Sequence, residues 1–157
     1  MVVDFQVAVL ADIEILLTLI REYYAYDGHE FEEGKLRRAL GDLLANESYG
    51  YAWLILDGET VIGYMAMCFG YSLEFGGRDA FIDEIYLREA YRGQGIGTQA
   101  IQHMLDACRA NGIQALHLEV MPGNTDALRL YERVGFVNRG SSLMSQAVYT
   151  PTAALAD

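Results

Sequence analysis

A glycine-rich segment, Arg92-Gly93-Gln94-Gly95-Ile96-Gly97, has the clearest capacity for chemistry in this sequence. It follows a strand-like run and opens a helix-like one, and the N-terminus of a helix offers free N–H groups and a partial positive charge to an anion. Two known phosphate motifs do not fit, because Thr98 stands where the dinucleotide fingerprint needs glycine or alanine, and no P-loop lysine follows. The segment predicts a phosphate site of another kind, with an ordinary glycine-rich turn as the alternative.

This loop and a second motif downstream resemble the GCN5-related N-acetyltransferase (GNAT) superfamily. The first motif is Tyr91-Arg92-x-x-Gly95-x-Gly97, which follows the strand-like Ile85-Tyr86-Leu87. The second is Asn124 followed by Leu130-Tyr131-Glu132-Arg133-Val134-Gly135-Phe136. The resemblance covers residues 80–137 closely, and two motifs at this distance are more specific than the loop alone. It implies an enzyme that takes acetyl-CoA as co-substrate, needs no metal and acetylates an amine.

The resemblance also implies where the acetyl-CoA would lie. The loop amides would hold its pyrophosphate, the strand before the loop would pair with the pantetheine arm through Ile85 and Leu87, and Asn124 would contact the cofactor. The expected cofactor-binding residues are Ile85, Tyr86, Leu87, Arg92, Gly93, Gln94, Gly95, Ile96, Gly97, Thr98, Asn124, Ala127 and Tyr131.

Two adjacent carboxylates, Asp83 and Glu84, are the candidates for the base that such a transfer requires. A primary amine has a pKa of about 10.4, so it must lose a proton before it can attack. In a regular strand the two side chains face opposite sides, and only one reaches a given site, although a β-bulge could re-aim either. Similarity to polyamine acetyltransferases favours Asp83, other family members favour Glu84, and a base acting through water remains open.

Tyr131 is the expected general acid, because the resemblance places the family's usual phenol there. A phenol with a pKa of about 10 can protonate a departing thiolate. The alternative is a tyrosine that only packs in the core. The oxyanion needs no side chain, since a backbone N–H near Ile85 could stabilise it.

The acceptor is inferred from a segment rich in tyrosines and carboxylates, 22–30. Aromatic rings and carboxylates suit an ammonium group. Similarity to polyamine acetyltransferases makes a small cationic amine the leading hypothesis, with Tyr26, Asp27, Glu74 and Asp83 as its binding residues. Acetylation of an aminoglycoside, an amino acid or a protein lysine remains open, as does a non-catalytic CoA-binding regulatory domain.

The periodicity of apolar residues predicts the elements that would position these groups. It indicates one α/β domain over residues 1–150, with a mixed sheet flanked by helices on both faces, and a tail at 151–157. The resemblance implies that this domain has the GNAT fold, with a mostly antiparallel sheet. Asp12 is expected to cap the first helix, and Asp57-Gly58 and Gly76-Gly77 to form turns. Strands are expected at 5–9, 51–56, 60–69, 80–87, 115–121, 136–138 and 143–149, and helices at 13–24, 36–44, 95–109 and 125–134.

The composition narrows the classes of partner. The net charge of −11 argues against nucleic acid, whose phosphates require Lys and Arg, and is compatible with a cationic substrate or simply with solubility. No apolar run approaches the roughly 20 residues of a membrane span and the N-terminus lacks a signal peptide, so we expect a cytoplasmic protein without a membrane partner. Cys68 and Cys108 are expected to be free buried thiols. The resemblance leaves a homodimer open.

Overall fold

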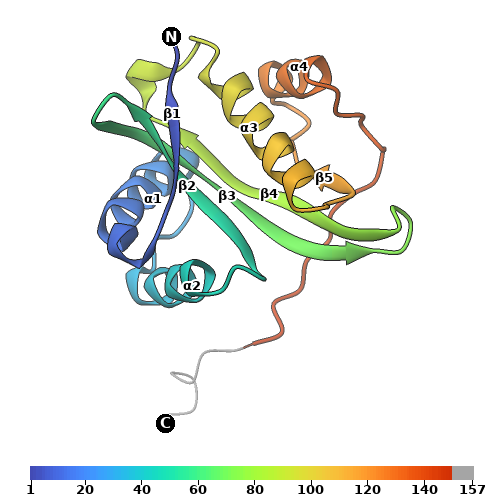
Figure 1. Cartoon of the computed structure of the whole chain (residues 1–157), viewed down its shortest axis with the longest axis horizontal. Coiled ribbons are helices and arrows are strands. Elements are labelled where there is room, and N and C mark those ends of the chain that lie inside the picture. Colours follow the sequence, from blue (N-terminus) through green and yellow to red (C-terminus); the bar gives the residue numbers. More distant parts are fainter. Residues whose placement is uncertain (150–157) are drawn as a thin grey trace.

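Five strands form one sheet at the centre of the fold, in a computed structural model that describes residues 1–149 (Figure 1). The strands are β1 (Asp4–Val7), β2 (Gly50–Asp57), β3 (Thr60–Ser72), β4 (Gly77–Leu87) and β5 (Ala115–His117). They are hydrogen-bonded in the order β1-β2-β3-β4-β5, antiparallel except for the parallel pair β4–β5. The predicted mixed, mostly antiparallel sheet is confirmed.

Tight turns at glycine join the central strands, as the sequence predicts. Gly58 has a φ of 59° between β2 and β3, and Gly76 has a φ of 77° between β3 and β4. Glycine adopts this left-handed conformation at little steric cost. β3 and β4 are consequently long neighbours, paired from Gly63↔Leu87 to Ser72↔Gly77.

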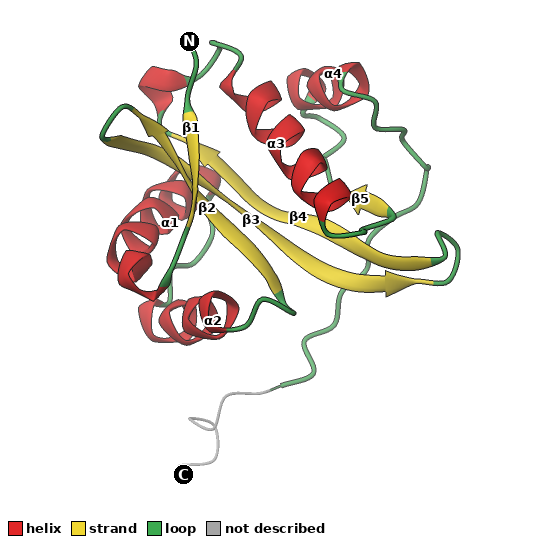
Figure 2. Ribbon diagram, in the orientation of Figure 1, coloured by secondary structure: helices red, strands yellow, loops and turns green. Residues whose placement is uncertain are grey.

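Helices cover both faces of the sheet, which confirms the predicted layers (Figure 2). One face carries α1 (Ile13–Asp27) and α2 (Glu33–Ala45), and the other carries α3 (Ile96–Ala110) and α4 (Thr125–Arg133). Short 3-10 turns at Leu10–Asp12 and Glu89–Tyr91 precede α1 and the glycine-rich loop.

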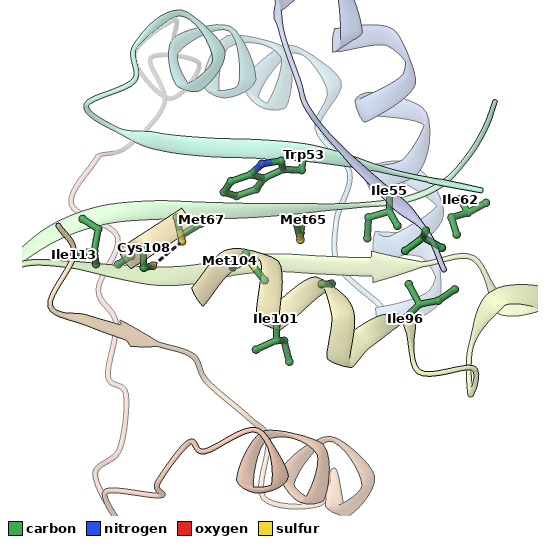
Figure 3. Packing of buried hydrophobic residues seen from close by; sticks show 13 residues of the cluster. Trp53, Ile55, Ile62, Met65, Met67, Ile96, Ile101, Met104, Cys108 and Ile113 are labelled. Carbon is green, nitrogen blue, oxygen red and sulfur yellow. Dashed lines mark hydrogen bonds between the residues drawn. The ribbon is translucent and has the colours of Figure 1, made fainter. Parts of the chain in front are cut away.

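Two separate cores follow from the alternation of side chains along the strands. Ala52, Leu54, Tyr64 and Ala66 pack with α1 and α2 in one core. The residues between them pack against α3, where Trp53, Ile55, Met65 and Met67 meet Ile96, Ile101 and Met104 (Figure 3). The sheet therefore contributes a buried apolar layer to each side.

Asp12 does not cap α1 in the way that the sequence predicts. No side-chain capping bond forms at this position, because the Asp12 carboxylate instead accepts a hydrogen bond of 2.8 Å from the backbone N–H of Val9. The carboxylate thus closes the 3-10 turn before the helix. At the other end, α1 stops at Gly28, whose φ is 74°.

The C-terminal part of the chain also departs from prediction. The strand expected at 115–121 ends at His117, and the chain after α4 runs down past β5 and away from the sheet (Figure 1). The strands expected at 136–138 and 143–149 do not form, and this prediction was wrong. Apolar alternation produces a strand only beside a partner strand and a core, whereas here Val137 is 81% exposed and Val148 95% exposed. The tail expected at 151–157 lies outside the described residues.

The sequence also predicts free thiols, no metal site and no membrane span. Both cysteines are free, as predicted, but the predicted burial holds for Cys108 only, since Cys68 is half-buried. Within residues 1–149, no helix is long and apolar enough to cross a membrane. The same described residues contain no group of three or more His, Cys, Asp or Glu arranged to hold a metal ion. The cytoplasmic location and the homodimer stay predictions.

Candidate active site

A β-bulge on β4 brings the two candidate base residues to the same side of the sheet. Glu84 pairs with Ala66 and Ile82 pairs with Met67, which leaves Asp83 as the extra residue between them. Asp83 and Glu84 consequently both line a pocket on the α1/α2 face. The expectation of opposite faces from a regular strand is therefore wrong, and the bulge that the family resemblance left open is present.

Glu84 is held by two phenols that approach from different elements. The hydroxyl of Tyr24, on α1, donates to Glu84 Oε2 at 2.8 Å, and the hydroxyl of Tyr64, on β3, donates to Oε1 at 3.2 Å. Burial raises the pKa of Glu84, the two phenols lower it and Asp83 raises it, and the net shift is upward. Glu84 is thus an oriented carboxylate that holds a proton more readily than a carboxylate in water.

Asp83 differs from its neighbour in access. Its side chain remains exposed, and no described residue donates a hydrogen bond to it. The atoms around the pocket nevertheless bury the carboxyl enough to raise its pKa. Of the two carboxylates, Asp83 is therefore the one whose oxygens are free to accept a new hydrogen bond within residues 1–149.

Tyr23, on α1, packs against the rings of Tyr24 and Tyr86, and the sequence-based set of site residues omitted it. Burial raises the pKa of Tyr23 to about 12. Four neighbouring groups add to that rise, in decreasing order Asp27, Glu84, Tyr131 and Asp83. The phenol thus lies within electrostatic range of both the expected base and the expected acid.

Tyr24 and Tyr64 were also missed as site residues, although the sequence held a signal for each. Tyr24 lies within the tyrosine-rich segment, one position from Tyr23, and its ring is 5.6 Å from the Tyr23 ring. Tyr64 needs the β3–β4 register, in which Ala66 lies opposite Glu84 and Tyr64 stands two residues away on the same face. Burial is the largest cause of the raised pKa of both phenols.

The glycine-rich loop ends in the N-terminus of α3, as predicted. Gly93 and Gly95 have φ values of 72° and 81°, and Gly95 is the residue that caps the helix. The backbone N–H groups of residues 94–98 donate no hydrogen bond to other described residues. α4 lies next to this end of α3, because a Cβ atom at Gly97 would lie 3.4 Å from the Leu130 side chain, an ordinary contact distance. The loop is a set of free donors at the positive end of a helix, which fits a pyrophosphate.

Arg92 ties this loop to the strand that precedes it. Its Nε donates to the carbonyl oxygen of Leu87 at 2.9 Å. Its guanidinium lies 4.4 Å from the ring centre of Tyr26 and 5.6 Å from that of Tyr86. The guanidinium therefore packs between two aromatic rings, and Tyr26, expected at the acceptor, lies against the loop instead.

The other predicted site residues lie in three different places. Tyr131 is half-buried on α4 beside Phe136, and burial raises its pKa. Asn124 caps α4, because its Oδ1 accepts a hydrogen bond of 3.2 Å from the N–H of Ala127. Asp27 pairs with His29 at 2.7 Å at the end of α1. Glu74 pairs with Arg139 in the β3–β4 turn and does not line the pocket of Asp83 and Glu84.

An ion pair fixes α1 against the strand that carries the bulge. Glu22 binds Arg88 at 2.9 Å, and Arg88 also donates to the carbonyl oxygen of Val61 at 2.9 Å. The Tyr86 hydroxyl donates to Glu22 at 3.4 Å. These contacts hold the tyrosine-bearing end of α1 over β4, which is what places the Tyr24 phenol on Glu84.

Comparisons with known proteins agree with this geometry. A thialysine N-epsilon-acetyltransferase from Bos taurus is 36% identical over 78 residues, which are 50% of this chain and 45% of that protein. The chain spans about half the length of the curated relatives it matches. Among solved structures, the integron cassette protein HFX_CASS3 from the Cole Harbour Salt Marsh metagenome has a TM-score of 0.83 at 31% identity, over 94% of this chain and 91% of that one.

A second solved structure shares the fold at lower identity. It is a predicted acetyltransferase from Clostridium acetobutylicum that was solved with acetyl-CoA. Its TM-score is 0.78 at 20% identity, over 92% of this chain and 96% of that one. The profile of the family described as "Acetyltransferase (GNAT) family" matches residues 14–136, from α1 to Phe136, the last residue of the second motif. That match covers most of the chain, including the bulge, the glycine-rich loop and Tyr131, and the chain belongs to the GNAT family of acetyltransferases.

Proposed function

We propose that this protein transfers the acetyl group of acetyl-CoA directly to a primary amine of a small cationic substrate. The observation that carries the proposal is the bulge, which sets Asp83 and Glu84 together at one pocket. The free N–H groups of residues 94–98 support the donor side, because they suit the pyrophosphate of acetyl-CoA. Acetyl-CoA supplies the activated thioester carbonyl.

The two carboxylates take different parts in this proposal. Asp83 accepts the proton of the bound ammonium, since its oxygens are free and its pKa is raised by burial. Glu84, oriented by Tyr24 and Tyr64, adds negative charge that favours binding of the cation. The amine nitrogen then forms its bond to the carbonyl carbon as the carbon–sulfur bond breaks. Tyr131 gives its proton to the departing thiolate, and its raised pKa keeps the phenol protonated until then. The acetylated nitrogen loses its second proton to solvent, from which the Tyr131 phenolate recovers one.

The thiol in the pocket supports direct transfer over a route through an acylated cysteine. Cys68 lines the same pocket as Asp83 and Glu84. Burial raises the pKa of this thiol, and the two carboxylates raise it further. A thiol held in its protonated form is a poor nucleophile, so Cys68 does not suit the part of an acyl carrier.

The acceptor in this proposal is a small amine, with a polyamine as one candidate. The charged residues that line the pocket are all acidic, and the chain carries a net charge of −11, so a cation is favoured. The relative from Bos taurus is named as an acetyltransferase for the ε nitrogen of thialysine, which is compatible with a primary amine here.

A thiol-release assay tests the proposal. The protein is mixed with acetyl-CoA and a panel of primary amines, and free CoA is measured. We expect Asp83→Asn to lower kcat/KM by about 10²- to 10⁴-fold, the usual contribution of a general base. Tyr131→Phe should lower kcat while acetyl-CoA still binds. Tyr71→Phe, at an exposed residue outside the pocket, is the matched control.

Two results would contradict the proposal in different ways. Binding of acetyl-CoA without thiol release for any amine would indicate a CoA-binding domain that does not catalyse. Thiol release that survives both Asp83→Asn and Glu84→Gln, with an unchanged pH profile, would remove these carboxylates from the mechanism.

A further inference from the structure

The pocket beside the carboxylates extends into an apolar section under α2 that the proton transfer does not need. The pocket has a volume of about 350 Å³, at the small end of the range for ligand sites. Away from Asp83 and Glu84 it is lined mainly by aliphatic side chains. These come from α1, α2 and the sheet, and include Leu16, Ile20, Leu36, Leu40, Leu43 and Ala66.

Small side chains on neighbouring strands leave this space open. Ala52 on β2 lies directly opposite Ala66 on β3, and Ala66 lies opposite Glu84 on β4. The two alanines and the carboxylate thus form one row across the sheet, on the face covered by α1 and α2. Larger residues in the same positions would fill the volume with their own side chains. The row makes an apolar floor that adjoins the acidic group.

The charges around the pocket are all of one sign. Asp42 lies at its rim on α2, Asp83 and Glu84 lie on β4, and the lining within residues 1–149 contains no Lys, Arg or His. A cation is therefore drawn to this site, and the place with the strongest negative potential is the pair on the bulge. Hydroxyl groups entering the aliphatic section would lose water without gaining partners, which is costly.

We infer that the acceptor amine carries an apolar alkyl or aryl body next to its reacting nitrogen, and that this body occupies the section lined by α2 and the row of alanines. The ammonium lies at Asp83 and Glu84, and the apolar body extends from there toward Leu40 and Leu43. The inference rests on the proposed function for the identity of the reaction. It goes further in naming the class of amine, and it disfavours polyhydroxylated amines such as aminosugars.

A series of primary amines tests this inference. The probes are ethylamine, n-hexylamine and glucosamine, each assayed for thiol release from acetyl-CoA. Each methylene that becomes buried should raise kcat/KM by roughly fourfold, so we expect hexylamine to exceed ethylamine by at least about tenfold. Glucosamine should be the poorest of the three. Equal rates for ethylamine and hexylamine, or a preference for glucosamine, would overturn the inference while leaving acetyl transfer intact.

Two variants test whether the preference for hexylamine over ethylamine arises in this pocket. Ala39→Leu narrows the pocket from an exposed position of α2, where folding tolerates the change, and Ala66→Leu fills the floor. Each should reduce the ratio of hexylamine to ethylamine activity toward one. Ala45→Leu, also exposed on α2 but outside the pocket lining, is the control and should keep the ratio. An unchanged ratio in Ala39→Leu would contradict the assignment of the apolar body to this section.

A binding measurement separates this inference from the proposed function. Thermal denaturation without acetyl-CoA reports occupation of the pocket directly, since a ligand that binds the folded state raises Tm. Hexylamine should raise Tm in the parent protein and in Ala45→Leu, and less in Ala39→Leu. That pattern together with no thiol release would refute the proposed function and retain the pocket. Thiol release without any Tm difference between the amines would refute the inferred apolar section and retain the proposed acetyl transfer.

Discussion

Replacing Tyr24 with phenylalanine should raise the pKa of Glu84, because the ionised carboxylate loses a donor. The Tyr24 hydroxyl approaches Glu84 Oε2 at 2.8 Å, against 3.2 Å for Tyr64 and Oε1. A hydrogen bond to a charged group contributes about 1.5–3 kcal/mol. At about 1.36 kcal/mol per pKa unit, loss of this bond corresponds to a rise of about 1–2 units. Water can take up part of the lost bond at the open side of the pocket, so we expect a value near the lower end.

The titration of Glu84 can be followed directly by carbon NMR of the glutamate carboxyl groups, with Glu84→Gln to assign the signal. Tyr23→Phe is the matched control, because its ring is 5.6 Å from that of Tyr24 and its hydroxyl makes no hydrogen bond to Glu84 among the described residues. If ionised Glu84 favours binding of the ammonium, the acidic limb of kcat/KM moves to higher pH in Tyr24→Phe. A Glu84 pKa that stays the same or falls in a folded Tyr24→Phe protein would refute the reasoning.

Three further predictions concern other parts of the molecule. Gly95→Ala should weaken acetyl-CoA binding, measured by calorimetric titration, and lower the stability of the fold by roughly 1–2 kcal/mol, measured by Tm, because φ is 81° at this position. The control is Gly41→Ala in α2, where an added Cβ would meet nothing within 4 Å. Glu22→Gln should lower the free energy of unfolding by about 1 kcal/mol, since it removes the charge from a partly exposed pair with Arg88, and high salt should reduce the difference; a loss independent of salt would contradict this. Ile101→Ala should destabilise by about 2–5 kcal/mol in urea denaturation, because Ile101 is 1% exposed in the α3 core, and a loss below that range would mean that the core collapses around the cavity.

Most of the layered fold was predictable from the sequence, because strong periodicity and turn residues act locally. The Asp57-Gly58 hairpin, the Gly76 turn and the helix after the glycine-rich loop all form where expected. The failures lie where a local pattern needs a distant partner. Residues 143–149 alternate like a strand, but Met144 is 91% exposed and the segment has no neighbouring strand among the described residues.

The candidate site was predictable in part for the same reason. The loop and Tyr131 belong to contiguous motifs, so sequence alone could single them out. The contacts of Glu84 depend on Tyr24 and Tyr64, which lie 60 and 20 positions away in the sequence. The packing of α1 on the sheet brings Tyr24 to the carboxylate, and the β3–β4 register brings Tyr64. Glu74 was wrongly grouped with the pocket for the same reason. It pairs with Arg139 at the β3–β4 turn, and the sequence around that turn does not predict this pairing.

The bulge at Asp83 interrupts the regular alternation of inward-facing and outward-facing side chains along β4. The residues of β4 that pack toward the α3 core are Ala80, Ile82, Ile85 and Leu87, which follow steps of two, three and two. The step of three is the signature of one residue added without disturbing the core on either side. Removing Asp83 would therefore restore an uninterrupted alternation and leave a sheet that could still fold, but with a single carboxylate where there are now two. The pairing of the two carboxylates at one pocket and the foldability of β4 are thus separable, because both depend on the same single added residue in different ways.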